Sequence, residues 1–209
     1  MRTLVVAALL LPAAAAAQRG VGIELGLRLA YAPSLGNAAG LVPMSEAVDV
    51  QVPIQLDAAW ATETFGAGTY VSWAPGQAGA QGCTDGASCS AQVTRAGVQA
   101  IWKVREASLG GAMPWLGGGL GWEWASHRRE RLGAATTTRW NGPELSLQGG
   151  AAWRAGERFT VGPYLLVGVG WYERVTIETA ESSGSGSLGD RAVHGWIHVG
   201  VRGTAAFFF

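Results

Sequence analysis

The stretch that decides the fold is VHGWIHVGVRGTAAFFF, residues 193–209. Successive residues of a β-strand point to opposite faces of a sheet, so alternate positions of this stretch describe two faces. One face is apolar or small throughout and ends at Phe209. The other face is mostly polar or small, and it includes His194, His198 and Arg202. This alternation indicates a strand between two different environments, either in the wall of a membrane barrel or at the edge of a soluble β-sandwich.

The amino-terminal residues favour an exported protein. Arg2 precedes a short apolar run at residues 4–11, and small residues continue as far as Ala17. A positive start, a short apolar segment and an Ala-x-Ala cleavage site are typical of a secretory signal peptide, and the run is too short for a transmembrane helix. The sequence therefore predicts a signal peptide over residues 1–17, cleaved near Ala17, and one exported domain over residues 18–209.

The composition narrows the kind of domain further. The formal net charge is +0 and no basic tract occurs, so nucleic acid is not an expected partner. Lys103 is the only lysine, although a soluble secreted β-protein normally carries many lysines and glutamates on its surface. The 32 glycines and 10 tryptophans are high numbers for 209 residues. Glycine without a collagen period indicates crowded, curved strands.

Eight segments of the chain alternate between apolar residues and polar or small ones. The predicted strands cover residues 21–31, 50–60, 65–73, 93–104, 114–124, 144–153, 159–172 and 193–209. Their connections alternate between long and short, which is the outer-membrane pattern of long external loops and short periplasmic turns. Each segment has about the ~9–11 residues that a tilted membrane strand needs. The even number of strands places both ends of the exported domain on the short-turn side.

Large aromatic residues gather at the ends of the predicted strands, on the apolar face. They flank a band of Leu, Val, Ile and Ala, and together they form two belts. Amphipathic rings favour the headgroup region of a bilayer, which explains why there are two belts. The predicted membrane-interface residues are Tyr31, Trp60, Trp73, Trp102, Trp122, Trp124, Trp153, Trp171 and Phe209. A soluble sandwich offers no reason for sorting tryptophans to strand ends.

A soluble lipocalin-type barrel also has eight alternating strands, but with the polarity inverted. Its charged face would be the outer one. Here the non-apolar face holds mainly Gly, Ala, Gln, Ser and Tyr, and small residues suit a crowded interior better than a surface in water. The predicted fold is therefore all-β: an eight-stranded antiparallel up-and-down transmembrane β-barrel with short periplasmic turns and long extracellular loops.

With these features the exported domain resembles the small eight-stranded outer-membrane β-barrels of Gram-negative bacteria, of the OmpA transmembrane-domain and OmpX type. The resemblance rests on the strand pattern, the aromatic belts and the terminal Phe209, which resembles the signal that marks such barrels for insertion. It implies a location in the outer membrane, contact with outer-membrane lipid and lipopolysaccharide, and recognition of the C-terminal strand by the barrel-assembly machinery. We also expect a monomer without a cofactor.

Charged residues on the inward face are the main candidates for a functional site. This interior charge network comprises Glu24, Arg28, Asp57, Arg95, Lys103, Glu123, Glu144 and Arg202. Eight strands leave an interior that side chains can fill, and buried charges must be paired. Four acids and four bases therefore predict a mutually paired network that plugs the lumen. The alternative is a narrow gated path in which the pairs exchange partners.

The only two cysteines, Cys83 and Cys89, lie close together in a predicted loop. In an exported chain, two close cysteines most simply form one disulfide. A metal pair is the alternative, but no histidine lies near this loop. We expect a disulfide that stiffens the loop and has little effect on the stability of the whole fold.

An enzyme is the rival class of function, because some small outer-membrane barrels act on lipids or proteins. The candidate residues are His127, His194 and His198, with serines such as Ser126 and Ser146. A hydrolase needs a nucleophile, a base and an orienting acid together. No inward serine stands beside His194 or His198 in the sequence, and the Ser126–His127 pair falls in a predicted mobile loop. No catalytic residue and no metal site are therefore predicted.

The loops are the remaining candidate surface, because loops on a rigid scaffold often carry recognition. A basic cluster at residues 127–131 would lie near lipopolysaccharide phosphates, or would simply be solvated. The predicted function is a structural, envelope-integrity or surface-contact role, including adhesion, with a charge-plugged lumen. A narrow channel for small or apolar solutes is the second candidate, and a lipid-modifying outer-membrane enzyme is the third.

Overall fold

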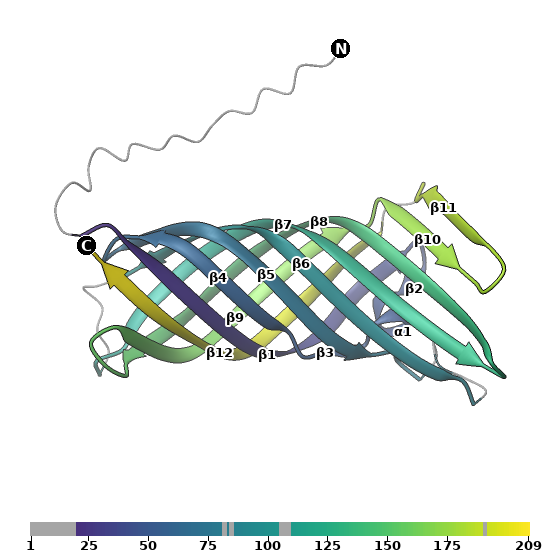
Figure 1. Cartoon of the computed structure of the whole chain (residues 1–209), viewed down its shortest axis with the longest axis horizontal. Helices are drawn as coiled ribbons and strands as arrows, with labels where there is room; N and C mark the ends of the chain where they lie inside the picture. The colour runs from purple at the N-terminus through teal and green to yellow at the C-terminus, as the bar shows by residue number, and fades with distance from the viewer. Residues whose placement is uncertain (1–19, 81–82, 84–85, 105–109, 190–191) are drawn as a thin grey trace, which may run out of the picture.

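Eight antiparallel strands follow one another around a closed barrel (Figure 1). The computed structural model describes residues 20–80, 83, 86–104, 110–189 and 192–209, and the predicted signal peptide lies outside these residues. The wall strands are β1 (Gly22–Ala39), β4 (Ile54–Ala61), β5 (Phe65–Gln77), β6 (Ser88–Lys103), β7 (Met113–Arg131), β8 (Ala134–Arg154), β9 (Phe159–Trp171) and β12 (Val193–Phe208). Each wall strand pairs with its neighbour in the chain, and β1 pairs with β12 to close the ring. The predicted up-and-down barrel is confirmed.

Smaller elements lie at one end of the barrel, opposite the C-terminus (Figure 1). The connection from β1 to β4 contains β2 (Val42–Pro43), the one-turn helix α1 (Met44–Ala47) and β3 (Val50–Gln51). The connection from β9 to β12 contains the hairpin of β10 (Arg174–Glu178) and β11 (Ser183–Ser187). We call this the loop side of the barrel, and the end with the short connections the turn side. Within the described ranges, no helix is long and apolar enough to cross a membrane.

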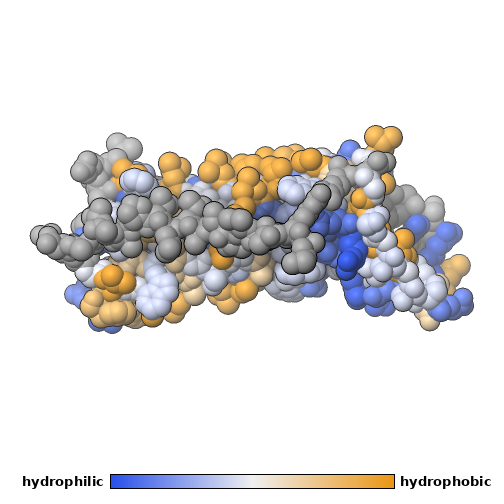
Figure 2. Space-filling model, turned by 90° about the horizontal axis from the view of Figure 1, so that it is seen from above, coloured by the Kyte–Doolittle hydropathy of each residue, from blue (hydrophilic) through white to orange (hydrophobic). Residues whose placement is uncertain are grey.

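The wall strands form because their side chains alternate between two surfaces. In β1 the outward Leu25, Leu27 and Leu29 are 49–55% exposed, whereas the inward Glu24 and Arg28 are 4% and 0% exposed. This is the reverse of a soluble protein, in which leucine is usually buried and arginine exposed. Figure 2 shows hydrophobic surface along the middle of the barrel wall and hydrophilic surface gathered at the loop side. The wall is therefore suited to lipid and the interior to polar side chains.

Close packing of the wall depends on glycine at several inward positions. A Cβ atom on Gly162 of β9 would lie only 1.8 Å from the carbonyl oxygen of Ala151 in β8. No side chain fits at that distance, so the two backbones approach as closely as they do only because this residue is glycine. This contact gives one physical reason for the high glycine content of the chain.

Two expectations about the strands were wrong. Residues 126–139 were predicted to be a charged loop, but they continue β7 and β8 as a regular hairpin whose register pairs Arg128 with Thr137. Leu132 and Gly133 both have positive φ at its tip, as a two-residue turn of a twisted hairpin requires. The predicted strand 50–60 is interrupted, because β3 ends at Gln51 and β4 begins at Ile54. Pro53 lies in the gap, and proline cannot donate a ladder hydrogen bond.

Candidate functional site: the charged lumen

The interior charge network is drawn from six of the eight wall strands. Because side chains alternate along each strand, Glu24 and Arg28 of β1 share the inward face, as do Arg95 and Lys103 of β6. β4, β7, β8 and β12 each contribute one residue of the eight. Seven of the eight residues are buried, and Lys103 is the exception, with 20% of its side chain exposed. The structure divides them into two clusters.

The turn-side cluster consists of Glu24, Arg28, Asp57, Lys103 and Arg202. Glu24 receives hydrogen bonds from the Lys103 ammonium and from Arg202 Nη2, the latter at 2.8 Å. Asp57 Oδ2 accepts from Arg28 Nε at 2.8 Å and lies 3.6 Å from Arg202 Nε. The β1–β12 register sets the two arginines directly opposite each other. Asp57, placed between their guanidinium groups, offsets the repulsion that two like charges would otherwise cause.

Arg28 spans the middle of the lumen and is fully buried. In addition to its bond with Asp57, Arg28 donates hydrogen bonds to the side-chain oxygens of Gln99, at 2.8 Å, and Gln148. Its guanidinium also lies 5.4 Å from the ring centre of Tyr164. These partners come from different sides of the barrel, so a single side chain links facing walls. The five guanidinium donors of arginine suit this bridging position better than the single ammonium of lysine.

The loop-side cluster is centred on Arg95. Arg95 Nε lies 2.7 Å from Glu123 Oε2 and 2.8 Å from Glu144 Oε2, so two carboxylates converge on one guanidinium. Glu123 Oε1 also accepts a hydrogen bond from the Tyr172 hydroxyl and lies 3.0 Å from Nε2 of His194. The Arg95 guanidinium lies over the ring of the buried Trp196, at 5.0 Å.

The two clusters differ in their balance of charge. The turn-side cluster joins three cations to two carboxylates, whereas the loop-side cluster joins one arginine to two carboxylates and His194. The four acids and four bases are equal in number over the whole network. The turn-side cluster, however, has one more cation than carboxylates, and the loop-side cluster has one more carboxylate than arginines. Each ion is buried enough that losing its partner would leave a costly uncompensated charge. Both clusters place side chains across the lumen.

An apolar plug, which the sequence did not reveal, closes the loop side above these clusters. The chain after β2 turns inward, and Met44 and Val48 are completely buried against the inner wall. Their partners include Trp140, Tyr172 and Trp196. Met44 lies in a connection between two predicted strands, and such a short apolar segment gives no periodic signal of where it will pack. Trp115, likewise missed, occupies an inward position of β7 that strand alternation could have identified.

The inward His194 contacts an acid and an aromatic ring of the loop-side cluster. His194 pairs with Glu123 and stacks on Tyr172 at 4.1 Å between ring centres. In the part of the chain that the structure describes, no serine or cysteine is hydrogen-bonded to His194 or His198, and no group of three or more acidic, histidine or cysteine residues could hold a metal. Ser126 and His127 lie in β7, not in a loop as predicted.

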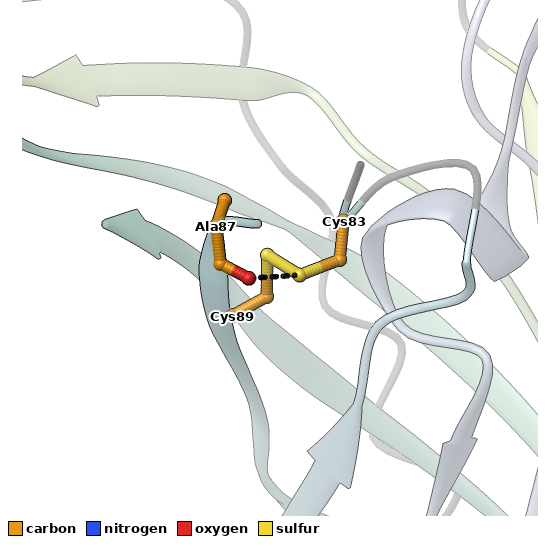
Figure 3. The surroundings of a disulfide bond; sticks show 3 residues. All are labelled: Cys83, Ala87 and Cys89. Atoms are coloured by element: carbon orange, nitrogen blue, oxygen red, sulfur yellow. Dashed lines mark hydrogen bonds between the residues drawn. A yellow bond between two sulfur atoms is a disulfide. The ribbon is translucent and has the colours of Figure 1, made fainter. Parts of the chain in front are cut away.

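Cys83, in the connection after β5, and Cys89, near the start of β6, form a disulfide, as predicted (Figure 3). Their Cα atoms are 5.9 Å apart, and Cys83 Sγ lies 3.2 Å from the carbonyl oxygen of Ala87. The bond joins residues only six positions apart and connects no separate wall strands. The disulfide therefore constrains a short segment on the loop side, away from both charge clusters.

The basic cluster predicted at residues 127–131 is not one patch, because strand alternation divides its members between two faces. Arg128 points outward and pairs with Glu130 at 3.3 Å, and the outward Arg139 pairs with Glu178 at 2.7 Å. His127 turns inward toward the barrel mouth, beyond the membrane-spanning part of β7. Partial burial, and to a lesser extent the neighbouring Arg129, lower the pKa of His127 below its usual value.

The predicted interface aromatics lie on the outer surface. Tyr31, Trp60, Trp73, Trp102, Trp124, Trp153, Trp171 and Phe209 are exposed, and Trp122 is half-buried. Large apolar side chains such as Leu116, Leu120 and Leu147 are also exposed on the wall, at 60–70%. A surface of this kind is an aggregation hazard in water and is stable when lipid covers it.

Comparison with known proteins identifies the fold. No protein-family model matches the chain, and no curated protein matches its sequence. Among solved structures, Neisserial surface protein A (NspA) aligns with a TM-score of 0.54 and 11% identity, over 86% of this chain and 95% of that one. A major outer membrane protein from Thermus thermophilus aligns with a TM-score of 0.57 and 15% identity, over 88% and 99%. The likeness is to small outer-membrane β-barrels, and at these identities it shows the fold alone.

Proposed function

We propose that this chain is an outer-membrane β-barrel with a closed lumen, which serves the cell envelope as a structural and surface-contact protein. The observation that carries the proposal is the closure of the lumen by the turn-side cluster, the loop-side cluster and the apolar plug of Met44 and Val48. A barrel filled in this way offers no wide path to solutes. The fold it shares with a Neisserial surface protein and with a major outer membrane protein supports the same role.

The surface available for contact is a rim of β-structure on the loop side, residues 126–139 and 174–187. β8 has 21 residues, which span about 70 Å and give roughly 50 Å of height at a tilt of about 40°. The apolar band of an outer-membrane barrel is only about 25 Å tall, so much of β8 extends beyond the lipid. We expect this rim to carry the contact surface, in place of long flexible loops.

The proposed partners follow from the surfaces. Outer-membrane lipid would cover the apolar wall, and the barrel-assembly machinery would recognise β12 during insertion, after export directed by residues 1–17. Lipopolysaccharide phosphates remain proposed partners of the rim, although Glu130 and Glu178 already pair with the outward arginines Arg128 and Arg139 and would compete with them. We propose a non-catalytic role, in which His194 belongs to the loop-side cluster through its contacts with Glu123 and Tyr172. We propose that the protein acts as a monomer.

The test is single-channel conductance of refolded residues 18–209 in a planar bilayer, after a heat-dependent gel shift has verified folding. The proposal predicts silence from the folded protein. An Arg28→Ala variant, which removes the side chain that bridges the lumen, should show raised conductance, whereas the rim variant Arg128→Ala should remain silent. Discrete openings of the unaltered protein would refute the closed lumen and favour a narrow channel.

A further inference from the structure

The turn side of the lumen contains a cavity that the proposed function does not use. Its volume is about 250 Å³, and it opens at the end of the barrel near the short connections. Glu24, Lys103 and Arg202 line its polar part, and Met113, Trp115 and Phe208 contribute apolar walls. Pockets for drug-sized ligands measure roughly 300–1,000 Å³, so this cavity suits a smaller molecule. We call it the turn-side cavity.

The polar part of this cavity has a surplus of positive charge. The turn-side cluster joins Arg28, Lys103 and Arg202 to only two carboxylates, those of Glu24 and Asp57. Arg28 and Arg202 are almost completely buried, and in such surroundings an uncompensated charge is costly. Among the described residues, the other charged side chains that line the cavity are two acids and two bases, which leave this surplus unchanged: Glu63, Glu157, Arg154 and Arg158. An anion that entered the cavity would meet two cations of the cluster, Lys103 and Arg202, and would offset the surplus charge of the cluster.

Lys103 is the cation best placed to meet such an anion. Its side chain is 20% exposed, against 6% for Arg202 and 0% for Arg28. Its ammonium has three hydrogens and donates one hydrogen bond to Glu24, so it can donate others toward the cavity. Arg202 lies beside it, held by Glu24 at 2.8 Å and stacked 5.0 Å from the Trp115 ring centre. Charge-assisted hydrogen bonds from these two groups would be among the stronger kinds.

We propose that the turn-side cavity binds a small carboxylate with an apolar chain. The carboxylate would lie against Lys103 and Arg202, and the chain would contact Met113, Trp115 and Phe208. The surplus positive charge favours an anion, and the apolar walls favour a hydrocarbon body over inorganic phosphate. The proposal concerns the turn-side mouth alone, so it does not depend on whether the loop-side rim makes surface contacts or whether the lumen conducts.

The test is equilibrium dialysis of radiolabelled hexanoate against the refolded protein in nanodiscs of uncharged lipid, with empty nanodiscs as the measure of partition. We expect saturable binding beyond the empty discs. Lys103→Gln removes the surplus charge, while Glu24 keeps Arg202 as its partner, and it should weaken binding at least about tenfold. The matched variant Lys103→Arg keeps the charge and should bind within about threefold of the unaltered protein.

A second variant and a competitor keep the test independent of how well Lys103 variants fold. Ala206 lines the cavity, so Ala206→Leu should fill part of it and weaken hexanoate binding without altering any charge. Hexanol has the same chain without the anion and should compete poorly. Binding that is equal in Lys103→Gln, or displacement by hexanol as effective as that by unlabelled hexanoate, would overturn the carboxylate site and leave only an apolar cavity.

Discussion

Replacing Arg95 with methionine tests the charge clusters most directly. Arg95 is the one cation that Glu123 and Glu144 share, through Nε contacts of 2.7 and 2.8 Å, and all three side chains are at most 4% exposed. Methionine keeps much of the volume and removes the charge. In the variant, Glu123 would still accept a hydrogen bond from Tyr172 and contact His194, whereas Glu144 would lose its only ion-pair partner among the described residues.

The expected magnitudes follow from this unequal sharing. Removing one partner of a buried ion pair costs about 3–5 kcal/mol. Arg95→Met leaves two buried carboxylates without their arginine, so the free energy of unfolding should fall by about 4–5 kcal/mol. Glu144→Gln leaves Arg95 paired with Glu123 and should cost about 1 kcal/mol or less. The double variant should recover part of the Arg95→Met loss, because one stranded carboxylate is gone.

The assay is reversible urea unfolding from lipid vesicles, followed by tryptophan fluorescence. Trp196, stacked under Arg95, should report on the change. The unfolding midpoints and slopes of the three variants and the unaltered protein give the free energies. Equal losses in Arg95→Met and Glu144→Gln would refute the reasoning, since they would mean that Arg95 is not the shared partner. A loss below about 1 kcal/mol in Arg95→Met would do the same, because that is the range of exposed pairs.

Three further perturbations test other parts of the barrel. Gly162→Ala should lower the free energy of unfolding by at least about 2 kcal/mol in the same urea assay, because the added Cβ would lie 1.8 Å from a backbone oxygen. The control is Gly184→Ala, which should have little effect because the space around Gly184 is open. Reduction of the Cys83–Cys89 bond should leave the heat-dependent gel shift intact, and loss of the shift would contradict a constraint limited to this short segment. The pKa of His127 is lower in the folded protein than its ordinary value, so the native state binds fewer protons, and stability should fall as the pH drops below about 6.5. The free energy of unfolding should therefore be lower at pH 5 than at pH 8 in the unaltered protein. The difference between the two pH values should be smaller in His127→Gln.

The wall of the barrel could be predicted because lipid and lumen impose a period of two on the sequence. Leu25, Leu27 and Leu29 alternate with Glu24 and Arg28, and this alternation alone distinguishes the outward face from the inward one. Beyond the lipid this constraint ends. Residues 126–139 have water on the outer face and polar groups on the inner one, so the hairpin has the composition of a loop although its backbone remains paired.

The pairing inside the lumen could not be predicted, because it depends on the stagger of strands that are distant in the sequence. Arg28 meets Asp57 because β4 pairs with β1 in a register that sets Gly26 opposite Asp57, and Arg202 reaches the same carboxylate from β12. The sequence shows four acids and four bases but no register. The inward fold of Met44 was equally hidden, since it depends on the shape of the cavity that the finished barrel leaves.

The paired backbone of the rim has a consequence for any molecule that meets it. A flexible loop that becomes ordered on contact loses conformational entropy worth about 1–2 kcal/mol for each residue fixed, and this loss is subtracted from the binding energy. The continuation of β7 and β8 is already fixed by its ladder of hydrogen bonds, from Ser126 opposite Arg139 to Arg131 opposite Ala134. A partner that docks there meets a preorganised surface, so even a small contact area can hold it, but a partner of different shape cannot be accommodated by rearrangement.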